Sequence, residues 1–268
     1  MHPSVRPIVS ALALSFALPT LRSVAAQSAP AASSAAAELR VSAGRRWSGQ
    51  VDESISSRHF IGSGFGAAAE LRWIVRGTLF DASLTGGSAA IDPTSGANGS
   101  RERVSSGDLR LAAMRRLGGD ASSSDGFAVG VGLRAMTSFT SHDIAAPQPI
   151  SSQYLLGALS LGPRIAWRRQ MVGGRIDATL GTDLVSLVDR PFGRIDGGRP
   201  PFALSVASLS RLRTGNAALS YSTGTNRRVG LVTTYTLDLL DYRDVQRVRT
   251  VAQSLAIGAR LRLRGASR

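Results

Sequence analysis

The chain has 268 residues and no cysteine, which excludes disulfide bonds, thiol catalysis and cysteine-based zinc sites. Its formal net charge is +14, and all 32 basic residues are arginines. The arginines are scattered along the chain instead of being massed in one segment, which argues against a nucleic-acid partner. Beyond the N-terminus no apolar run reaches the eighteen or so residues of a membrane-spanning helix, so a helical membrane protein is excluded as well.

The N-terminus has the pattern of a secretory signal. His2 and Arg6 precede an apolar run over residues 8–18. The run is too short to span a membrane as a helix, and the small residues after it are those that a signal peptidase reads. We predict cleavage after Ala26. Loss of Arg6 and Arg22 then lowers the formal charge from +14 to +12.

From residue 38 onward the sequence alternates between apolar and polar residues in short segments, separated by Gly, Ser, Asp and Asn clusters. A period of two is typical of β-strands. The ten predicted strands cover approximately residues 38–47, 59–71, 73–84, 107–117, 127–139, 153–168, 173–187, 202–222, 229–239 and 250–263.

Three segments carry further information. In the second, Gly62, Gly64 and Gly66 occupy every other position, which favours a crowded interior or a bend in the sheet. The eighth segment is long and broken at residues 213–216, which predicts either a bulge or an extension of the strand beyond the membrane. The last two segments each alternate over more than ten residues, about twice the length of an ordinary globular strand.

The predicted connections alternate between long and short. Long loops are expected at residues 49–58, 85–106, 140–152 and 188–201. Shorter turns are expected near Arg72 and at residues 118–125, 170–173 and 223–226. Bacterial transmembrane barrels have this asymmetry, with short periplasmic turns and longer outer loops.

The cost of an arginine in lipid decides which strand face is interior. An arginine at the membrane midplane on the lipid side costs about 2 to 4 kcal/mol, so the charged face must line the lumen. We expect a narrow lumen bridged by arginine–carboxylate pairs, with surplus positive charge. The predicted lumen-facing charged residues are Arg40, Glu70, Asp81, Asp108, Arg110, Arg134, Arg164, Arg168, Arg175, Asp177, Asp183, Asp238, Arg260 and Arg262.

Over residues 38–264 the pattern of long alternating strands, unequal loops and an N-terminal export signal resembles the bacterial outer-membrane β-barrel proteins. The resemblance implies an all-β fold with a single antiparallel, up-and-down transmembrane barrel. We predict about ten strands, with eight or twelve as alternatives. Many such barrels end on an aromatic residue, whereas this chain ends on a polar tail after Leu263.

The expected organisation is a cleaved signal peptide over residues 1–26, a flexible periplasmic lead over 27–37, the barrel over 38–264 and a C-terminal tail over 265–268. The expected location is the cell outer membrane. Aromatic residues that could form interfacial girdles are Trp47, Trp73, Tyr154, Trp167, Tyr221, Tyr235 and Tyr242.

The sequence offers little chemistry. His59 and His142 are the histidines that remain after cleavage, and His142-Asp143 is expected in an outer loop. Outer-membrane proteases of the omptin family use an Asp–His pair with a second carboxylate pair, and no second pair is evident here. Lipid A deacylases and palmitoyl transferases pair His with Ser, and neither histidine lies in a recognisable signature. We therefore predict no catalytic, cofactor-binding or metal-binding residues and no cofactor.

The predicted function is a non-enzymatic barrel, acting as a narrow anion-leaning pore or as a structural or adhesive platform that presents its outer loops. The alternatives are an outer-membrane enzyme, lipid A-modifying or omptin-like, and a soluble secreted β-barrel binding protein. Expected partners are outer-membrane lipid and lipopolysaccharide and the barrel-assembly machinery, without nucleic acid. The oligomeric state is left open.

Overall fold

The computed structural model describes residues 37–53, 56–94, 100–117, 125–144, 150–190, 204–225, 227–243 and 247–263, all within one compact unit. The predicted signal peptide, almost all of the predicted lead and the C-terminal tail lie outside the described residues, so their boundaries remain predictions. Within the described ranges no helix is long and apolar enough to cross a membrane.

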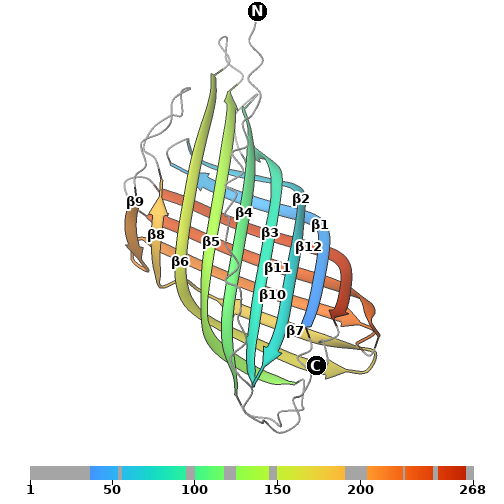
Figure 1. Cartoon of the computed structure of the whole chain (residues 1–268). Helices are drawn as coiled ribbons and strands as arrows, with labels where there is room; N and C mark the ends of the chain where they lie inside the picture. Colours follow the sequence, from blue (N-terminus) through green and yellow to red (C-terminus); the bar gives the residue numbers. More distant parts are fainter. Residues whose placement is uncertain are drawn as a thin grey trace, which may run out of the picture. The chain divides into compact units, whose positions relative to one another are not determined.

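The described residues form antiparallel β-strands in a meander (Figure 1). Their bounds are β1 Ala37–Asp52, β2 Ser56–Val75, β3 Thr78–Pro93, β4 Ser100–Leu117, β5 Gly126–Ile144, β6 Ile150–Met171, β7 Gly174–Gly181, β8 Val185–Asp189, β9 Leu204–Ser208, β10 Leu212–Thr223, β11 Val229–Arg243 and β12 Arg247–Leu263.

The sheet closes on itself. Going round the ring, β1 to β6 pair in sequence order, β6 pairs with β7, and β7, β10, β11 and β12 follow until β12 pairs with β1. Strands β8 and β9 stand outside this ring, with β8 hydrogen-bonded to β6 and β9 to β8. The predicted all-β, up-and-down barrel of ten strands is confirmed. Pairing of β12 with β1 closes the ring and removes the two free edges that an open sheet of these strands would have.

The two extra strands arise where the seventh and eighth predicted strands are interrupted. The chain leaves β7 at Gly181 and resumes as β8 at Val185, and a turn over residues 209–211 separates β9 from β10. The break predicted at residues 213–216 is therefore misplaced. Thr214 and Asn216 are buried and keep the alternation of β10, while Arg213, directly before Thr214, is exposed on its outer face.

Several strands run further than predicted, and the loops are correspondingly shorter. Within the stretch 85–106, predicted as one long loop, residues 85–93 continue β3 and residues 100–106 begin β4, with Thr85 opposite Asp108 and Ile91 opposite Glu102. Their Ser and Gly content suggested a loop, but Ile91 and Val104 are buried between the paired strands. The predicted turn near Arg72 is also misplaced, because β2 continues to Val75.

The turn from β2 to β3 consists of Arg76 and Gly77, both with positive φ (49° and 77°). Two consecutive positive φ values are the signature of a tight hairpin turn that matches the twist of the strands. A second two-residue connection joins β6 to β7. The first and last strand residues, Ala37 and Leu263, pair at the same end of the barrel as Trp73. We call this the short-turn end and the opposite end the outer end.

The outward face of every ring strand is apolar. Leu231 is 64% exposed and Ile257 is 65% exposed, values that a soluble protein rarely combines with a continuous apolar surface. One exposed apolar residue from each ring strand illustrates the band: Val41, Phe65, Leu84, Leu111, Val131, Leu161, Leu180, Leu219, Leu231 and Ile257. The apolar band is the lipid-facing surface of a transmembrane barrel.

Arg45 is an exception on this outward face. It is exposed and lies between Phe65 of β2 and Leu255 of β12 in the sheet. Its guanidinium donates a hydrogen bond to the Ser63 hydroxyl at 3.0 Å and lies 5.8 Å from the ring of Trp47. These contacts, together with the length of the side chain, reduce the cost of placing an arginine beside lipid.

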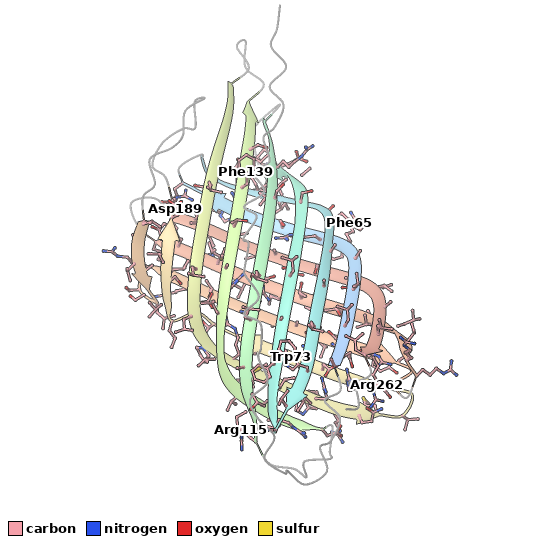
Figure 2. The ribbon with its side chains drawn as sticks, viewed as in Figure 1. Phe65, Trp73, Arg115, Phe139, Asp189 and Arg262 are labelled. Atoms are coloured by element: carbon pink, nitrogen blue, oxygen red, sulfur yellow. The ribbon has the colours of Figure 1, made fainter. Side chains whose placement is uncertain are left out.

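Aromatic pairs gather toward the short-turn end. Trp73 stacks on Phe80 with ring centroids 5.4 Å apart, and Phe127 lies 6.4 Å from Trp167. Figure 2 places Trp73 toward the same end of the view as Arg115 and Arg262, with Phe65 and Phe139 toward the other. Tyr242, predicted as a possible girdle residue, is instead only 3% exposed, because its position in β11 faces the lumen.

If the apolar face meets lipid, the loss of stability caused by an arginine on this face should depend on how deep in the membrane the arginine lies. Ile257 lies near the middle of the apolar stretch of β12, so Ile257→Arg should lower the free energy of unfolding by about 2 to 4 kcal/mol. Val229→Arg, on the same face beside the β10–β11 turn, should cost about 1 kcal/mol or less. Urea titration of the protein refolded in vesicles measures both. Equal costs at the two positions would contradict the assignment.

Candidate functional site

The lumen is the candidate site, because the inward face of the strands carries the buried charge. The side chains that meet there come from strands that are distant in sequence and opposite in the ring. Three levels of contact cross the lumen between the short-turn end and the outer end.

The level nearest the short-turn end is centred on Asp177 of β7, which is 2% exposed. Its carboxylate accepts hydrogen bonds from Arg40, from Arg168 at 2.6 Å and from Arg175 at 3.0 Å. Arg72 lies 3.5 Å away. Arg40 belongs to β1, four strands from β7 round the ring, so its contact with Asp177 crosses the lumen.

Further carboxylates complete this level. Arg175 donates to both oxygens of Glu38, at 2.7 and 2.8 Å, and thereby also joins β7 to β1. Arg72 pairs with Glu70 at 2.5 Å and with Asp81 at 2.6 Å. Because each guanidinium here has carboxylate partners, the charges of the cluster largely compensate one another.

The middle level joins β4 to β11, five strands apart round the ring. Arg110 donates to Asp108 of its own strand at 2.6 Å and to Asp238 of β11 at 2.5 Å. Arg134 of β5 also contacts Asp108 at 2.6 Å. The contact between Arg110 and Asp238 therefore spans the barrel.

Arg164 and Asp183 continue the middle level, with their charged atoms 2.6 Å apart. Asp183 also accepts a hydrogen bond from the Thr214 hydroxyl at 2.7 Å and lies 3.5 Å from Arg134. Asp183 follows β7 where the strand is interrupted, and the interruption places its carboxylate among these partners.

The third level, toward the outer end, combines polar bridges with an apolar cluster. Gln50 of β1 donates to the Thr140 hydroxyl of β5 at 3.0 Å, and Arg190 pairs with Asp52 at 2.8 Å. Both contacts cross the lumen. The buried apolar residues beside them are Met136, Leu156, Ala158, Val188, Ala207, Leu212, Leu240, Tyr242 and Val248.

Small cavities remain between these levels. One of about 100 Å³ is lined by residues of the first and middle levels, including Arg40 and Arg110. Two further cavities of about 50 Å³ lie against Arg46, and all three share Thr85 in their walls. Cavities of this size and polarity hold a few water molecules each.

Almost all of the predicted lumen residues are buried or half-buried on the inward face. Arg262 is the exception. It lies on the same face of β12 as Arg260, but it is exposed, because β12 ends one residue later, where the lumen opens. Arg260 itself is fully buried and donates to the backbone carbonyl of Gly224 at 2.6 Å.

The sequence reasoning missed several charged residues of the lumen. Glu38 and Arg46 belong to the inward parity of β1, and extending the alternation already seen at Arg40 would have found both. Arg72 lies where the sequence predicts a turn. Asp52 and Arg190 lie in stretches that the sequence predicts as loops, to which the alternation of a strand does not apply.

The two histidines predicted to remain after cleavage lie on different strands, β2 and β5. His59 is exposed at the outer end of β2. His142 was predicted in a loop, but it lies in β5, in register between Glu102 of β4 and Ser152 of β6. Among the described residues no group of three or more His, Asp or Glu side chains could hold a metal ion.

A closed ten-stranded ring, an apolar outward band and a charged interior together define a bacterial outer-membrane β-barrel. No protein-family model matches the sequence, and no curated protein matches it. Among solved structures the chain is similar to the outer membrane protease OmpT from Escherichia coli, with 8% identity, coverage of 88% of this chain and 99% of that chain, and a TM-score of 0.45.

The chain is also similar to the translocator domain of the autotransporter NalP from Neisseria meningitidis, with 14% identity, coverage of 84% and 88%, and a TM-score of 0.49. A third similar structure is Neisserial surface protein A, with 12% identity, coverage of 84% and 97%, and a TM-score of 0.34. At such low identities these similarities concern the fold alone and carry no information on function.

Proposed function

We propose that the protein is a non-enzymatic outer-membrane barrel with a closed lumen, which serves as a structural or adhesive platform for its outer sheet and loops. The observation that carries the proposal is the set of contacts across the lumen at three successive levels. They include Arg40 to Asp177, Arg110 to Asp238 and Arg190 to Asp52.

The energetics of these contacts support a closed lumen. A solute that crosses the barrel must break a buried ion pair at each level, and a buried charge that loses its partner is strongly destabilised. The cavities between the levels, about 100, 50 and 50 Å³, are large enough for ordered water, and the ion pairs separate them. The apolar cluster around Val188 and Leu240 adds a dry layer near the outer end.

The lengths of the strands support a platform. A transmembrane strand needs about 9 to 11 residues. Strands β4, β5 and β6 have 18, 19 and 22 residues, so this part of the sheet projects beyond the membrane. Arg103, exposed on the outward face of β4, is placed in this projecting part, where water instead of lipid surrounds it.

A narrow anion-leaning pore is the second candidate. It is favoured by the three cavities with shared walls and by Arg46, which lines two of them. Arg46 donates to the Ser48 hydroxyl at 3.4 Å, and it shares the wall of one cavity with Asp108 and Asp238. Water threading these cavities past Arg46 would favour anions.

Conductance in a planar bilayer separates the two candidates. The closed lumen predicts that the wild-type protein inserts without producing stable current steps. Folding of the same sample is checked by its heat-dependent migration on gels, so that silence is not mistaken for failed insertion. Stable openings with anion preference in a salt gradient would overturn the platform in favour of the pore.

We further propose outer-membrane lipid and the barrel-assembly machinery as partners.

A further inference from the structure

Five arginines gather on the outer ends of β10, β11 and β12, and we call this set the outer arginine patch. Arg211 and Arg213 belong to the turn before β10 and to β10 itself, Arg243 ends β11, and Arg247 and Arg249 begin β12. Arg211, Arg213, Arg243 and Arg249 are exposed, and Arg247 is partly exposed.

Sheet register brings these residues together. Arg213 lies opposite Asp241, Asp241 lies opposite Arg249, and Arg243 lies opposite Arg247. The backbone N–H of Arg243 donates to the carbonyl of Arg211 at 2.6 Å. Directly opposite residues in a sheet have Cβ atoms about 5 Å apart, so the guanidinium groups share one small area.

The patch keeps a net positive charge. Asp241 accepts hydrogen bonds from Arg247 at 2.9 and 3.1 Å and from Arg243 at 2.6 and 2.9 Å. These bonds hold the pKa of the Asp241 carboxyl well below its usual range, so it stays ionised. Glu53 is also nearby and accepts the backbone N–H of Arg247 at 3.2 Å. Among the described residues, five guanidinium groups against these two carboxylates leave a formal excess of three positive charges.

The patch lies directly above the lipid-facing band. Leu239, two residues before Asp241, is 42% exposed on the same face, and Val251 follows Arg249 on the same face of β12. A step of two residues along a strand is about 7 Å. The guanidinium groups therefore stand where acyl chains end and lipid headgroups begin.

The patch faces the outer leaflet. It lies at the end opposite the short-turn end, where Ala37 and Leu263 pair beside Trp73. Short turns mark the periplasmic side of bacterial barrels. Headgroups at the level of the patch therefore belong to the phosphorylated glycolipid of the outer leaflet and not to the periplasmic phospholipids.

We propose that the outer arginine patch binds the phosphate groups of outer-leaflet lipopolysaccharide, with the acyl chains lying on the apolar face of β10 to β12 below it. Guanidinium groups match phosphate in geometry and charge and often bind it through two hydrogen bonds. Asp241 positions Arg243 and Arg247, while Arg213 and Arg249 flank it on the neighbouring strands. This site does not depend on whether the lumen is open or closed.

The test compares two triple variants that remove the same charge at opposite ends of the barrel. The first is Arg213→Gln, Arg243→Gln and Arg249→Gln. The control is Arg115→Gln, Arg227→Gln and Arg228→Gln, three exposed arginines toward the short-turn end. Each full-length protein is refolded in detergent, checked for heat-dependent migration, and titrated with fluorescent lipid A that carries both phosphates.

The proposal predicts that the first triple variant binds lipid A about a hundredfold more weakly than the wild type and that the control variant binds within about threefold of it. Lipid A without phosphates should bind the wild type as weakly as the variant binds phosphorylated lipid A. Equal loss in both variants, or equal binding of the two lipids, would overturn the proposal. Competition by inorganic phosphate at an affinity similar to that of lipid A would indicate a free-anion site and would overturn it too.

Discussion

Replacing Asp177 with asparagine should lower the free energy of unfolding by about 3 to 5 kcal/mol, the cost of removing one partner from a buried ion cluster. The carboxylate is the shared partner of Arg40, Arg168 and Arg175, and Arg72 lies 3.5 Å away. Asparagine has nearly the same volume but no charge, so several guanidinium groups would lose compensation in a site that is almost closed to water.

Unfolding of the refolded protein in urea measures this effect, with Asp241→Asn as the matched control. Asp241 also binds two arginines, but it lies at the exposed outer end, where an ion pair contributes about 1 kcal/mol or less. A loss at Asp177 no larger than that at Asp241 would show that the short-turn end of the lumen is hydrated and that its ion pairs do not close it.

The second large effect is expected at Gly258, in the seam where β12 closes the ring against β1. A Cβ at this position would lie 1.9 Å from the Val41 carbonyl oxygen and 2.5 Å from the Ser42 Cα. These are backbone atoms, which cannot move without displacing the strand. Gly258→Val should therefore cost about 3 kcal/mol or more, at the upper end of overpacking penalties, and should slow or prevent barrel closure.

Gly86→Val is the control for this substitution. Gly86 lies in β3, and the nearest atom to a Cβ there is the Ser106 carbonyl oxygen at 3.7 Å, an ordinary contact. The yield of heat-resistant folded protein after refolding distinguishes the two variants. Refolding of Gly258→Val with the yield of Gly86→Val would mean that β1 and β12 do not approach as closely as the structure has them.

Strand alternation was sufficient to predict the ring and its two faces. The alternation in β11 and β12 predicts that Leu231 and Ile257 face lipid and that Asp238 and Arg260 face the lumen. In the structure Leu231 and Ile257 are exposed on the apolar band. The argument works because an arginine beside lipid is costly, so the polar parity must face inward. Arg45, on the lipid face between Ser63 and Trp47, shows that local contacts can offset that cost.

The ends of the strands were not predictable in the same way. Residues beyond the membrane are free of the lipid constraint, so Ser- and Gly-rich stretches such as 85–93 and 100–106 look like loops although they pair as strands. Where the sequence predicts a loop instead of a strand, it cannot predict which charged residues face the lumen, and Asp52 and Arg190 are two examples.

The contacts across the lumen could not be predicted at all from alternation. Whether Arg40 meets Asp177, or Arg110 meets Asp238, depends on which strands lie opposite each other and on the stagger of the closed ring. Both are properties of the whole barrel. The sequence predicted ion pairs in the lumen, but not their partners or their arrangement in successive levels.

The central claim is that alternate residues of each strand face lipid and the residues between them line the lumen. Three consecutive residues of β11 test it most directly. Because the chain has no cysteine, single cysteines can be placed at Leu237, Asp238 and Leu239 and labelled with a fluorophore. Lipids with brominated acyl chains should quench the label at Leu237 and Leu239, whereas a cysteine at Asp238, inside the closed lumen, should stay unlabelled or carry an unquenched label. Equal quenching at all three, or quenching at Asp238 alone, would contradict the account.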